Sequence, residues 1–246
     1  MDEKQIVSHR VVSVVLCAGQ GKRVGHQLNK ILLPIEGQPL FLYSVKVFER
    51  CPVVDEVLLV GATGEREQLS KLVRYAQCRK VQHIIQGGDT RHASEYCALQ
   101  FLRKRIETGE IGIILIHDGA RPLISVAQVN QVVEKAREVG GAILAVPLQE
   151  EERIVQVVDG TQTIQQGFSH EDQVWKAQTP QAFRAPLLLK AYDQAKKEQI
   201  QGTDTASVLE HFGYTVAIVE GSSTNLKVTT AYDLFHVERL IRHYRL

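Results

Sequence analysis

Apolar runs alternate with segments of helical periodicity along most of the chain. Short runs rich in valine and isoleucine predict buried β-strands, and longer segments with apolar residues three or four positions apart predict helices. The most apolar run, 111–116, is expected at the centre of a sheet. The predicted strands are 11–16, 54–60, 81–86, 111–116, 141–146, 174–177 and 214–219, with a short extended segment at 225–228. The predicted helices are 65–76, 90–106, 126–138, 185–198, 204–211 and 230–242.

This alternation predicts an α/β fold, in which a mostly parallel sheet is covered by helices on both faces. In such sheets, ligands bind at the carboxyl ends of the strands. Polar segments follow three predicted strands, at 17–30, 87–94 and 117–122, so we expect them to converge on one rim. No repeat and no clear linker divides the sequence, and we therefore expect a single domain over 1–246.

The pattern changes after Pro147, where two short extended runs flank Asp159-Gly160. An Asp-Gly pair between extended runs predicts a β-hairpin. A hairpin inserted into an α/β sheet has little core of its own, so this segment, about 147–172, is expected to protrude as an arm. The pattern leaves open whether the arm packs on another subunit or remains a solvated surface hairpin.

Composition excludes several classes of protein. The 246 residues are 44% hydrophobic and 23% charged, and a net charge of +1 does not indicate bulk binding to nucleic acid. Four cysteines without a Cys-x-x-Cys pair argue against a zinc site or a disulfide framework, and indicate a reducing compartment. The N-terminus lacks a signal sequence, and no apolar run approaches the roughly 20 residues of a membrane span. We therefore expect a cytoplasmic protein with no nucleic-acid or membrane partner.

The segment that follows the first strand combines glycines with cations. Gly19 and Gly21 precede Arg23, and Lys30 lies seven positions further on. Glycines allow backbone N–H groups to approach an anion closely, and Arg and Lys neutralise phosphate charge. We expect this segment to bind the phosphates of a nucleoside triphosphate.

Two familiar phosphate-binding motifs do not fit this segment. A Walker loop requires Ser or Thr after Gly-Lys, but Arg23 follows Gly21-Lys22. The dinucleotide fingerprint requires a third glycine where Val24 stands, which argues against a dehydrogenase. Taken alone, the segment also fits an ordinary glycine-rich turn between a strand and a helix.

Asp118 directly follows the most apolar strand, within His117-Asp118-Gly119-Ala120-Arg121-Pro122. A carboxylate at a strand end could hold Mg²⁺ or the hydroxyls of a bound sugar, since Mg²⁺ favours one or two carboxylates plus substrate phosphates. The alternative is that Asp118 caps the next turn and pairs with Arg121. We expect His117 to be structural.

Two further segments carry candidate residues. In Gly87-Gly88-Asp89-Thr90, either Asp89 or Thr90 is expected to cap the next helix, with Arg91 and Ser94 on one helical face. Lys227 lies in an apolar strand-like segment, where it either extends toward solvent or faces an anion.

Six motifs, read in order, resemble one family. The order resembles that of the 2-C-methyl-D-erythritol 4-phosphate cytidylyltransferases and the related ribitol 5-phosphate cytidylyltransferases, over about residues 12–240. The resemblance implies a Rossmann-like nucleotidyltransferase domain with a protruding arm, a homodimer, and Mg²⁺-dependent use of CTP. The motifs are the glycine segment with Arg23 and Lys30; Gly87-Gly88-Asp89 with Arg91 and Ser94; His117 to Pro122; Thr179-Pro180-Gln181; Thr203-Asp204; and Asn225-Leu226-Lys227-Val228-Thr229.

The resemblance also implies roles for individual residues. Arg23 and Lys30 are expected to stabilise the transition state, and Lys227 to position the substrate phosphate. Asp118, Thr179 and Lys227 are expected to contact the acceptor, with Asp118 also the metal ligand. The implied nucleotide-binding residues are Cys17, Ala18, Gly19, Gly21, Gly88, Asp89, Ser94 and Asp118.

The chain departs from the family pattern at several positions. Cys17 and Asn29 stand where the family usually has Ala and Pro, and Glu151 and Glu171 replace a Thr and an Arg that hold the substrate phosphate. The expected reaction joins CTP and 2-C-methyl-D-erythritol 4-phosphate to give the CDP-linked alcohol and pyrophosphate, in isoprenoid precursor synthesis. The alternatives are ribitol 5-phosphate or another sugar-alcohol phosphate as acceptor, or a nucleotide-binding homologue without catalysis.

Overall fold

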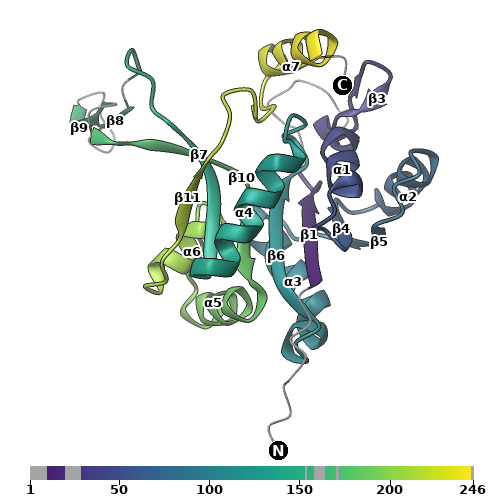
Figure 1. The fold of residues 1–246 in the computed structure, drawn as a ribbon, viewed down its shortest axis with the longest axis horizontal. Coiled ribbons are helices and arrows are strands. Elements are labelled where there is room, and N and C mark those ends of the chain that lie inside the picture. The colour runs from purple at the N-terminus through teal and green to yellow at the C-terminus, as the bar shows by residue number, and fades with distance from the viewer. Residues whose placement is uncertain (1–9, 20–28, 153, 158–163, 170–171, 245–246) are drawn as a thin grey trace, which may run out of the picture.

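A twisted, mostly parallel sheet forms the centre of the protein (Figure 1). The computed structural model describes residues 10–19, 29–152, 154–157, 164–169 and 172–244. Within these ranges the main sheet has seven strands in the order β11-β7-β10-β6-β1-β4-β5, and β10 alone runs antiparallel to its neighbours. The α/β prediction is confirmed, with the most apolar strand at the centre. The strands are β1 (Arg10–Leu16), β4 (Glu56–Gly61), β5 (Val81–Gln86), β6 (Ile111–Asp118), β7 (Gly141–Pro147), β10 (Trp175–Arg184) and β11 (Ala217–Glu220).

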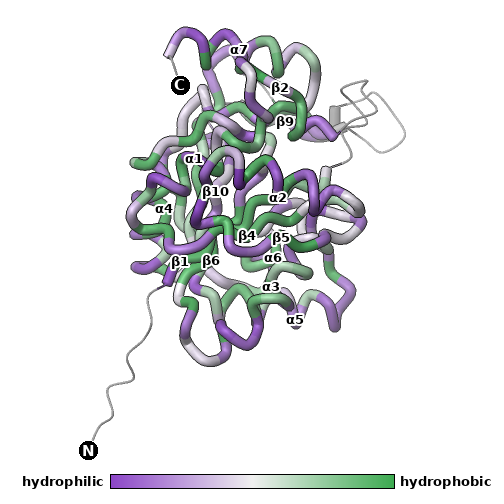
Figure 2. The backbone as a smooth tube through the Cα atoms, turned by 90° about the vertical axis from the view of Figure 1, so that its right-hand side faces the viewer, coloured by the Kyte–Doolittle hydropathy of each residue, from purple (hydrophilic) through white to green (hydrophobic). Residues whose placement is uncertain are grey.

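Helices cover both faces of this sheet, as predicted (Figures 1 and 2). One apolar core includes side chains of α1 (Leu40–Arg50), α2 (Arg66–Tyr75) and α4 (Val126–Val139). The core on the opposite face includes side chains of α3 (Arg91–Glu107), α5 (Ala185–Glu198) and α6 (Thr205–His211). A third cluster joins α7 (Ala231–Tyr244) to the body beside the carboxyl ends of the strands. None of the helices in the described ranges is both long enough and apolar enough to cross a bilayer.

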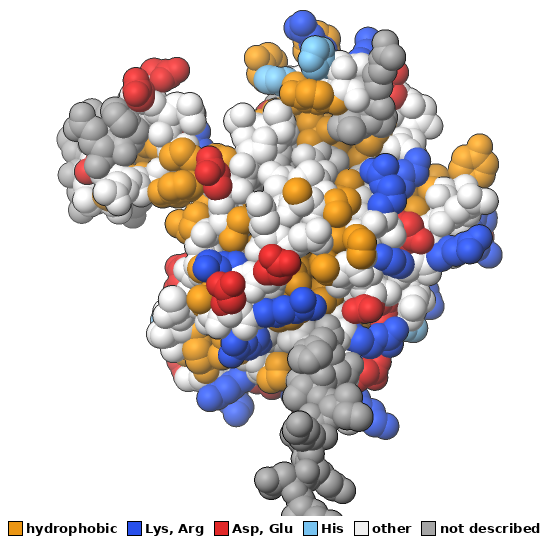
Figure 3. All heavy atoms as spheres, in the orientation of Figure 1, with side chains coloured by type: hydrophobic (Ala, Val, Ile, Leu, Met, Phe, Trp, Pro, Cys, Tyr) orange, Lys and Arg blue, Asp and Glu red, His pale blue; other side chains and the backbone are white. Residues whose placement is uncertain are grey.

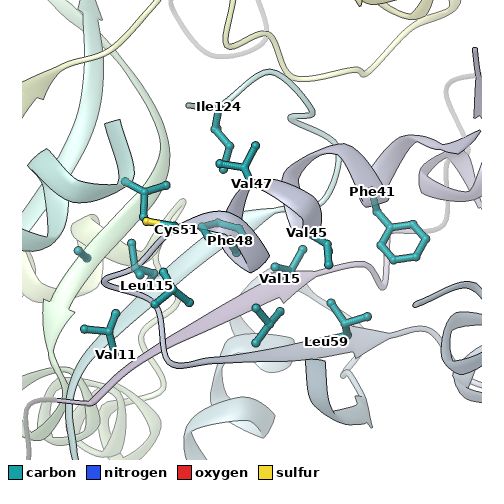
Figure 4. Close-up of a cluster of buried hydrophobic side chains, with 14 of the residues drawn as sticks. Val11, Val15, Phe41, Val45, Val47, Phe48, Cys51, Leu59, Leu115 and Ile124 are labelled. Carbon is teal, nitrogen blue, oxygen red and sulfur yellow. The ribbon is translucent and has the colours of Figure 1, made fainter. Parts of the chain in front are cut away.

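β1 shows how the residue pattern builds both layers. Successive side chains of a strand point to opposite faces, so Val11 and Val15 enter one core while Val12 and Val14 enter the other. All four are fully buried, each contributing roughly 1.5–3 kcal/mol of hydrophobic stabilisation as an upper estimate. Figure 4 shows Val11 and Val15 in the cluster that includes Phe48 of α1.

The apolar pattern did not predict α1. The first six residues of this helix, 40–45, are all buried, and they form a short continuous run that periodicity alone does not assign to a helix rather than a strand. The short elements before it were also not predicted: η1 (Lys30–Leu32), β2 (Pro34–Ile35) and β3 (Gln38–Pro39). The charged positions of α1 lie only in its second half, at Lys46, Glu49 and Arg50.

Several predicted boundaries and assignments differ from those in the structure. Thr90, rather than Asp89, caps α3, and its Oγ1 accepts a hydrogen bond from the Ala93 amide at 3.0 Å. The predicted extension of β11 back to residue 214 is wrong, since the strand begins at Ala217. The apolar segment around Lys227 is not a strand, and the Val228 amide donates to the Ala120 carbonyl at 2.9 Å.

A hairpin protrudes from the body within the range 147–172 (Figure 1). It consists of β8 (Ile154–Val157) paired antiparallel with β9 (Ile164–Phe168). Ile154 and Val155 are 44% and 42% exposed, and Figure 3 shows hydrophobic side chains along the stem of this arm. The Asp159-Gly160 turn, Arg153 and Glu171 lie outside the described residues.

A buried ion pair ties α3 to the start of β4. The Glu56 side chain is fully buried, and Arg105 donates to its two carboxylate oxygens at 3.1 and 2.7 Å. The bidentate geometry satisfies both oxygens, which offsets part of the cost of removing the charges from water. This pair lies at the amino end of the sheet, away from the carboxyl ends of the strands.

Candidate active site

The turns after β1, β5 and β6 meet at the carboxyl rim of the sheet. The Gly119 amide donates to the Leu16 carbonyl at 3.0 Å, which joins the turns after β6 and β1. A Cβ atom at Gly87 would lie 2.6 Å from Ser94 Oγ and 3.1 Å from the Cβ of Ala18. The turn after β5 therefore touches both the turn after β1 and the first turn of α3. Three segments that are distant in sequence share one rim.

Asp118 forms the electrostatic centre of this rim. Its side chain is 9% exposed, and its Oδ2 lies 2.9 Å from Lys227 Nζ and 3.6 Å from Arg121 Nε. Its Oδ1 accepts a hydrogen bond from Arg91 Nε at 3.3 Å. The cations come from α3, from the turn after β6 and from the segment before α7. The proposed pairing of Asp118 with Arg121 is present, together with two partners that sequence spacing did not indicate.

The charge state of Asp118 follows from these neighbours. Burial disfavours a charged carboxyl and raises its pKa, but the nearby positive charges of Lys227, Arg91 and Arg121 more than offset burial. The pKa of Asp118 is therefore well below its ordinary value, and the group is a carboxylate at neutral pH. With Glu95 beside Arg91, three cations face two carboxylates, so this part of the rim favours an anionic ligand.

His117 is buried beneath the rim and holds the turn after β6. Its Nδ1 lies 3.1 Å from Thr179 Oγ1, and its Nε2 lies 3.1 Å from the Arg121 carbonyl. Thr179 Oγ1 accepts from the Asp118 amide at 3.1 Å, so its hydroxyl proton is donated to His117 Nδ1 and the histidine carries its proton on Nε2. Burial lowers the pKa of His117 to about 4, in agreement with this neutral tautomer. Both ring nitrogens are engaged, as expected of a structural histidine.

The segment that carries Lys227 is fixed through Asn225. This side chain is fully buried and donates to the Thr179 carbonyl at 2.9 Å and to Gln178 Oε1 at 3.2 Å. The Asn225 carbonyl accepts from Arg121 Nη1 at 2.8 Å. Hydrogen bonds to β10 and to the turn after β6 therefore place Lys227 beside Asp118, although the segment belongs to no strand.

Lys30 begins η1 at the edge of the same rim. The preceding residue, Asn29, is buried, and its Nδ2 donates to the Cys17 carbonyl at 2.7 Å and to Glu65 Oε2 at 2.9 Å. Asn29 Oδ1 accepts from the Ile31 amide at 3.3 Å and caps the short helix. Asn29, which stands where the family usually has proline, thus connects the start of η1 to the end of β1.

The other predicted nucleotide-binding residues occupy different parts of the rim. The Cys17 side chain is buried in the core and burial raises the pKa of its thiol, so only its backbone lies at the rim. Ser94 Oγ accepts from the Gly88 amide and donates to the Gly88 carbonyl, both at 3.2 Å. Ala18 is half-buried, and Gly19 and Asp89 are exposed. Gly21 and Arg23 lie outside the described residues.

Asp118 fits a magnesium site only in part. Over the residues that the structure describes, no three His, Cys, Asp or Glu side chains gather closely enough to hold a metal ion by themselves. Mg²⁺ in nucleotide sites often takes one or two carboxylates and completes its shell with phosphate oxygens and water. Asp118, a single buried carboxylate at the carboxyl rim, could supply one such ligand.

Sequence reasoning missed Glu95, although a signal was present. Glu95 falls at helical spacing with Ala98, Leu99 and Leu102, which are all fully buried. A carboxylate on the apolar face of a helix implies a buried partner, because unpaired charges are not left in a core. Here the partner is Arg91, whose Nη1 lies 2.6 Å from Glu95 Oε1.

Comparison with known sequences gives one consistent result. The sequence model of the family described as 2-C-methyl-D-erythritol 4-phosphate cytidylyltransferase matches residues 11–243. A protein of that name from Geobacillus thermodenitrificans (strain NG80-2) is 39% identical over 229 residues, or 93% of this chain and 96% of the relative. Its counterpart from Alkaliphilus oremlandii (strain OhILAs) is 36% identical over 233 residues, or 94% of this chain and 95% of the relative.

Solved structures with similar names have the same fold as this chain. A 4-diphosphocytidyl-2C-methyl-D-erythritol synthase from Anaerococcus prevotii DSM 20548 superposes with a TM-score of 0.79 at 21% identity, covering 95% of this chain and 96% of that one. The 2-C-methyl-D-erythritol 4-phosphate cytidylyltransferase from Thermus thermophilus gives a TM-score of 0.71 at 26% identity, covering 93% and 98%. Sequence and fold agree along nearly the whole length, and the chain belongs to the 2-C-methyl-D-erythritol 4-phosphate cytidylyltransferase family.

Proposed function

We propose that the protein joins CTP and 2-C-methyl-D-erythritol 4-phosphate to give the CDP-linked alcohol and pyrophosphate, a step in isoprenoid precursor synthesis. The observation that supports this proposal best is the cluster of Lys227, Arg91 and Arg121 around Asp118. It lies beside two glycine turns at the carboxyl rim. A site for two phosphorylated substrates needs such an excess of positive charge.

The reaction requires positioning and charge neutralisation more than proton transfer. A phosphomonoester has a second pKa of about 6, so the acceptor is largely a dianion at neutral pH. One of its oxygens attacks the α-phosphorus of CTP, an O–P bond forms, and the bond from that phosphorus to the bridging oxygen breaks. Pyrophosphate leaves with the bonding electrons. The nucleophile has no proton to lose, so no general base is needed, and the engaged, neutral His117 agrees with this.

The cations of the rim bring two polyanions together. Lys227 is 38% exposed at its side chain, so its ammonium group can turn from Asp118 toward an acceptor phosphate. Lys30, beside the end of β1, and Arg23 are proposed to neutralise charge that develops on the transferred phosphoryl group. Cys17, Ala18, Gly19, Gly21, Gly88, Asp89 and Ser94 are proposed to line the nucleotide, and Thr179 to lie near the acceptor.

Asp118 is proposed to hold Mg²⁺ together with phosphate oxygens of CTP. When bound, the ion supplies positive charge at the phosphates. The chain's own part is to keep the Asp118 carboxylate ionised and oriented, which the three surrounding cations do. Removal of divalent cations with a chelator should abolish pyrophosphate release, and added Mg²⁺ should restore it.

The wider setting is proposed from features outside the rim. The four cysteines form no disulfide, which supports a reducing, cytoplasmic location. The exposed apolar side chains of Ile154, Val155 and Trp175 support packing of the arm on a second copy of the chain, and so a homodimer of single nucleotidyltransferase domains. Light scattering on the purified protein measures that stoichiometry.

A panel of acceptors and nucleotides tests the reaction. Pyrophosphate release is measured with 2-C-methyl-D-erythritol 4-phosphate and with ribitol 5-phosphate, each against CTP, ATP, GTP and UTP. The proposal expects release with CTP and the erythritol phosphate. Preference for ribitol 5-phosphate would assign the other acceptor. CTP binding without release from either acceptor would identify a homologue that has lost catalysis.

A further inference from the structure

A buried carboxylate with no direct part in the proposed transfer lies one helical turn beyond Arg91. Glu95 is 1% exposed. Its Oε1 lies 2.6 Å from Arg91 Nη1 and accepts from Thr205 Oγ1 at 2.7 Å, and its Oε2 accepts from the Tyr192 hydroxyl at 2.5 Å. The three donors come from α3, α6 and α5, so one side chain links three helices behind the rim.

The hydrogen-bond directions show that this group is arranged around Arg91. The Thr205 hydroxyl has one proton, which it donates to Glu95, so its oxygen accepts from Arg91 Nη1 at 3.4 Å. Arg91 Nη1 is thus held by two acceptors, while its Nε donates to Asp118 Oδ1 at 3.3 Å. One guanidinium group bridges the buried carboxylate and the carboxylate at the centre of the rim.

Packing alone does not account for Glu95. Its neighbours on the same face of α3, Ala98, Leu99 and Leu102, are fully buried apolar residues. Replacing a buried ion pair with apolar side chains is often neutral or stabilising, so the core itself does not require a carboxylate here. A carboxylate does, however, orient an arginine that must present a particular edge to a neighbouring group.

We propose that Glu95, supported by Thr205 and Tyr192, is a positioning residue that fixes Arg91 against Asp118. Glu95 holds Arg91 Nη1 on the side away from the rim, which leaves Arg91 Nε directed at Asp118 Oδ1. The Asp118 carboxylate is thereby oriented toward the nucleotide. This inference rests on the proposed cytidylyl transfer, because it assigns the Asp118 carboxylate a role in that reaction.

The test combines one substitution that removes the Glu95 charge at nearly constant size with a second, on α6, that restores a carboxylate near Arg91. Glu95→Gln keeps the size of the side chain but removes its charge and places an N–H₂ group among donors. We expect kcat/KM for CTP to fall about 10-fold to 100-fold, the range seen when a partner that orients a ligand-binding side chain is removed. In the double variant Glu95→Gln/Thr205→Asp, the new carboxylate stands where Thr205 Oγ1 contacts Arg91 Nη1, and most of the loss should be recovered.

A matched control lies on the same helix. Arg103 and Glu107 form a pair with the same spacing at 3.1 Å, with the Glu107 side chain 57% exposed and away from the rim. Glu107→Gln should leave kcat/KM unchanged. The proposal is overturned if Glu95→Gln retains wild-type kcat/KM, whatever its melting temperature, or if the double variant recovers melting temperature without kcat/KM.

The affinity for CTP, measured by calorimetry on the same proteins, tests the positioning role of Glu95 separately from the proposed reaction. A wild-type protein that binds CTP but releases no pyrophosphate refutes the proposed reaction. In that case the positioning role still predicts weaker CTP binding in Glu95→Gln and recovery in the double variant. Equal affinity in wild type and Glu95→Gln would then overturn it.

Discussion

Substitution of Lys227 by Met separates its effect on the site from its effect on the fold. The change keeps most of the aliphatic side chain and removes the ammonium group that lies 2.9 Å from Asp118 Oδ2. Because the lysine side chain is 38% exposed, solvent weakens this pair, and its loss should lower the free energy of unfolding by about 1 kcal/mol or less. For a chain of this size that corresponds to a fall in melting temperature of about 2–4 °C or less.

The effect on catalysis should be much larger. Lys227 is proposed to neutralise the acceptor phosphate where no other lysine contacts Asp118 in the described structure. Loss of one such electrostatic contact costs about 3–4 kcal/mol in the barrier, which is a fall of roughly 100-fold to 1,000-fold in kcat/KM. Lys227→Arg keeps the charge in a different geometry and should give an intermediate value.

Lys135→Met is the matched control. Lys135 Nζ lies 2.8 Å from Glu138 Oε2 on α4, and its side chain is 42% exposed, so this lysine resembles Lys227 in exposure and pairing distance but lies away from the rim. Pyrophosphate release is measured with the acceptor varied at saturating CTP, beside thermal melts of the same samples. If Lys227→Met kept a kcat/KM close to that of Lys135→Met, or lost activity only through unfolding, the assignment of Lys227 would be wrong.

Three further predictions concern stability. Between pH 7 and pH 5 the free energy of unfolding should fall by about 2 kcal/mol more in the wild type than in His117→Gln. The reason is that the pKa of His117 is about 4 in the folded protein, below its value in the unfolded chain, so only the unfolded chain takes up the proton in this range. Urea titrations at both pH values measure this difference. Glu56→Gln should lower the free energy of unfolding by about 1–3 kcal/mol in urea denaturation at neutral pH, because a buried carboxylate is lost while Arg105, 25% exposed, keeps its pair with Glu110 at 2.8 Å; an unchanged midpoint would contradict this expectation. Gly87→Ala should lower stability by about 1–3 kcal/mol, because the new Cβ would lie 2.6 Å from Ser94 Oγ and 2.9 Å from Val60 Cγ1; a melting curve equal to that of the wild type would show that the turn can relax.

Local patterns located much of the fold but could not place every element. β1 and β6 were predicted well because a strand buried on both faces reads as a continuous apolar run. α1 was not, because its first six residues form a short buried run whose type periodicity alone does not decide. The segment that carries Lys227 was read as a strand for a related reason: its apolar residues pack against α7 and the turn after β6 rather than in a sheet.

The sequence likewise predicted some residues of the site but not the contacts between them. Asp118 and Lys227 were identified because one directly follows the central strand and the other is a cation in an apolar segment. Their contact at 2.9 Å was not predictable, since it depends on hydrogen bonds that Asn225 makes to β10. Glu95 shows the opposite case: the helical pattern held the signal of a buried carboxylate four positions after Arg91, and only Thr205 and Tyr192 were hidden.

By itself, the sequence determined most of the segments that become strands and helices, and that glycine turns and charged residues follow the carboxyl ends of particular strands. These features depend on periodicity of 2 or 3.6 residues and on short spacings, so they can be seen in any window of the chain. The tertiary structure alone decided that Arg91 and Lys227 join Arg121 at the Asp118 carboxylate. Those contacts join α3, β6 and the segment before α7, and they follow from strand order and side-chain packing, which no local pattern specifies.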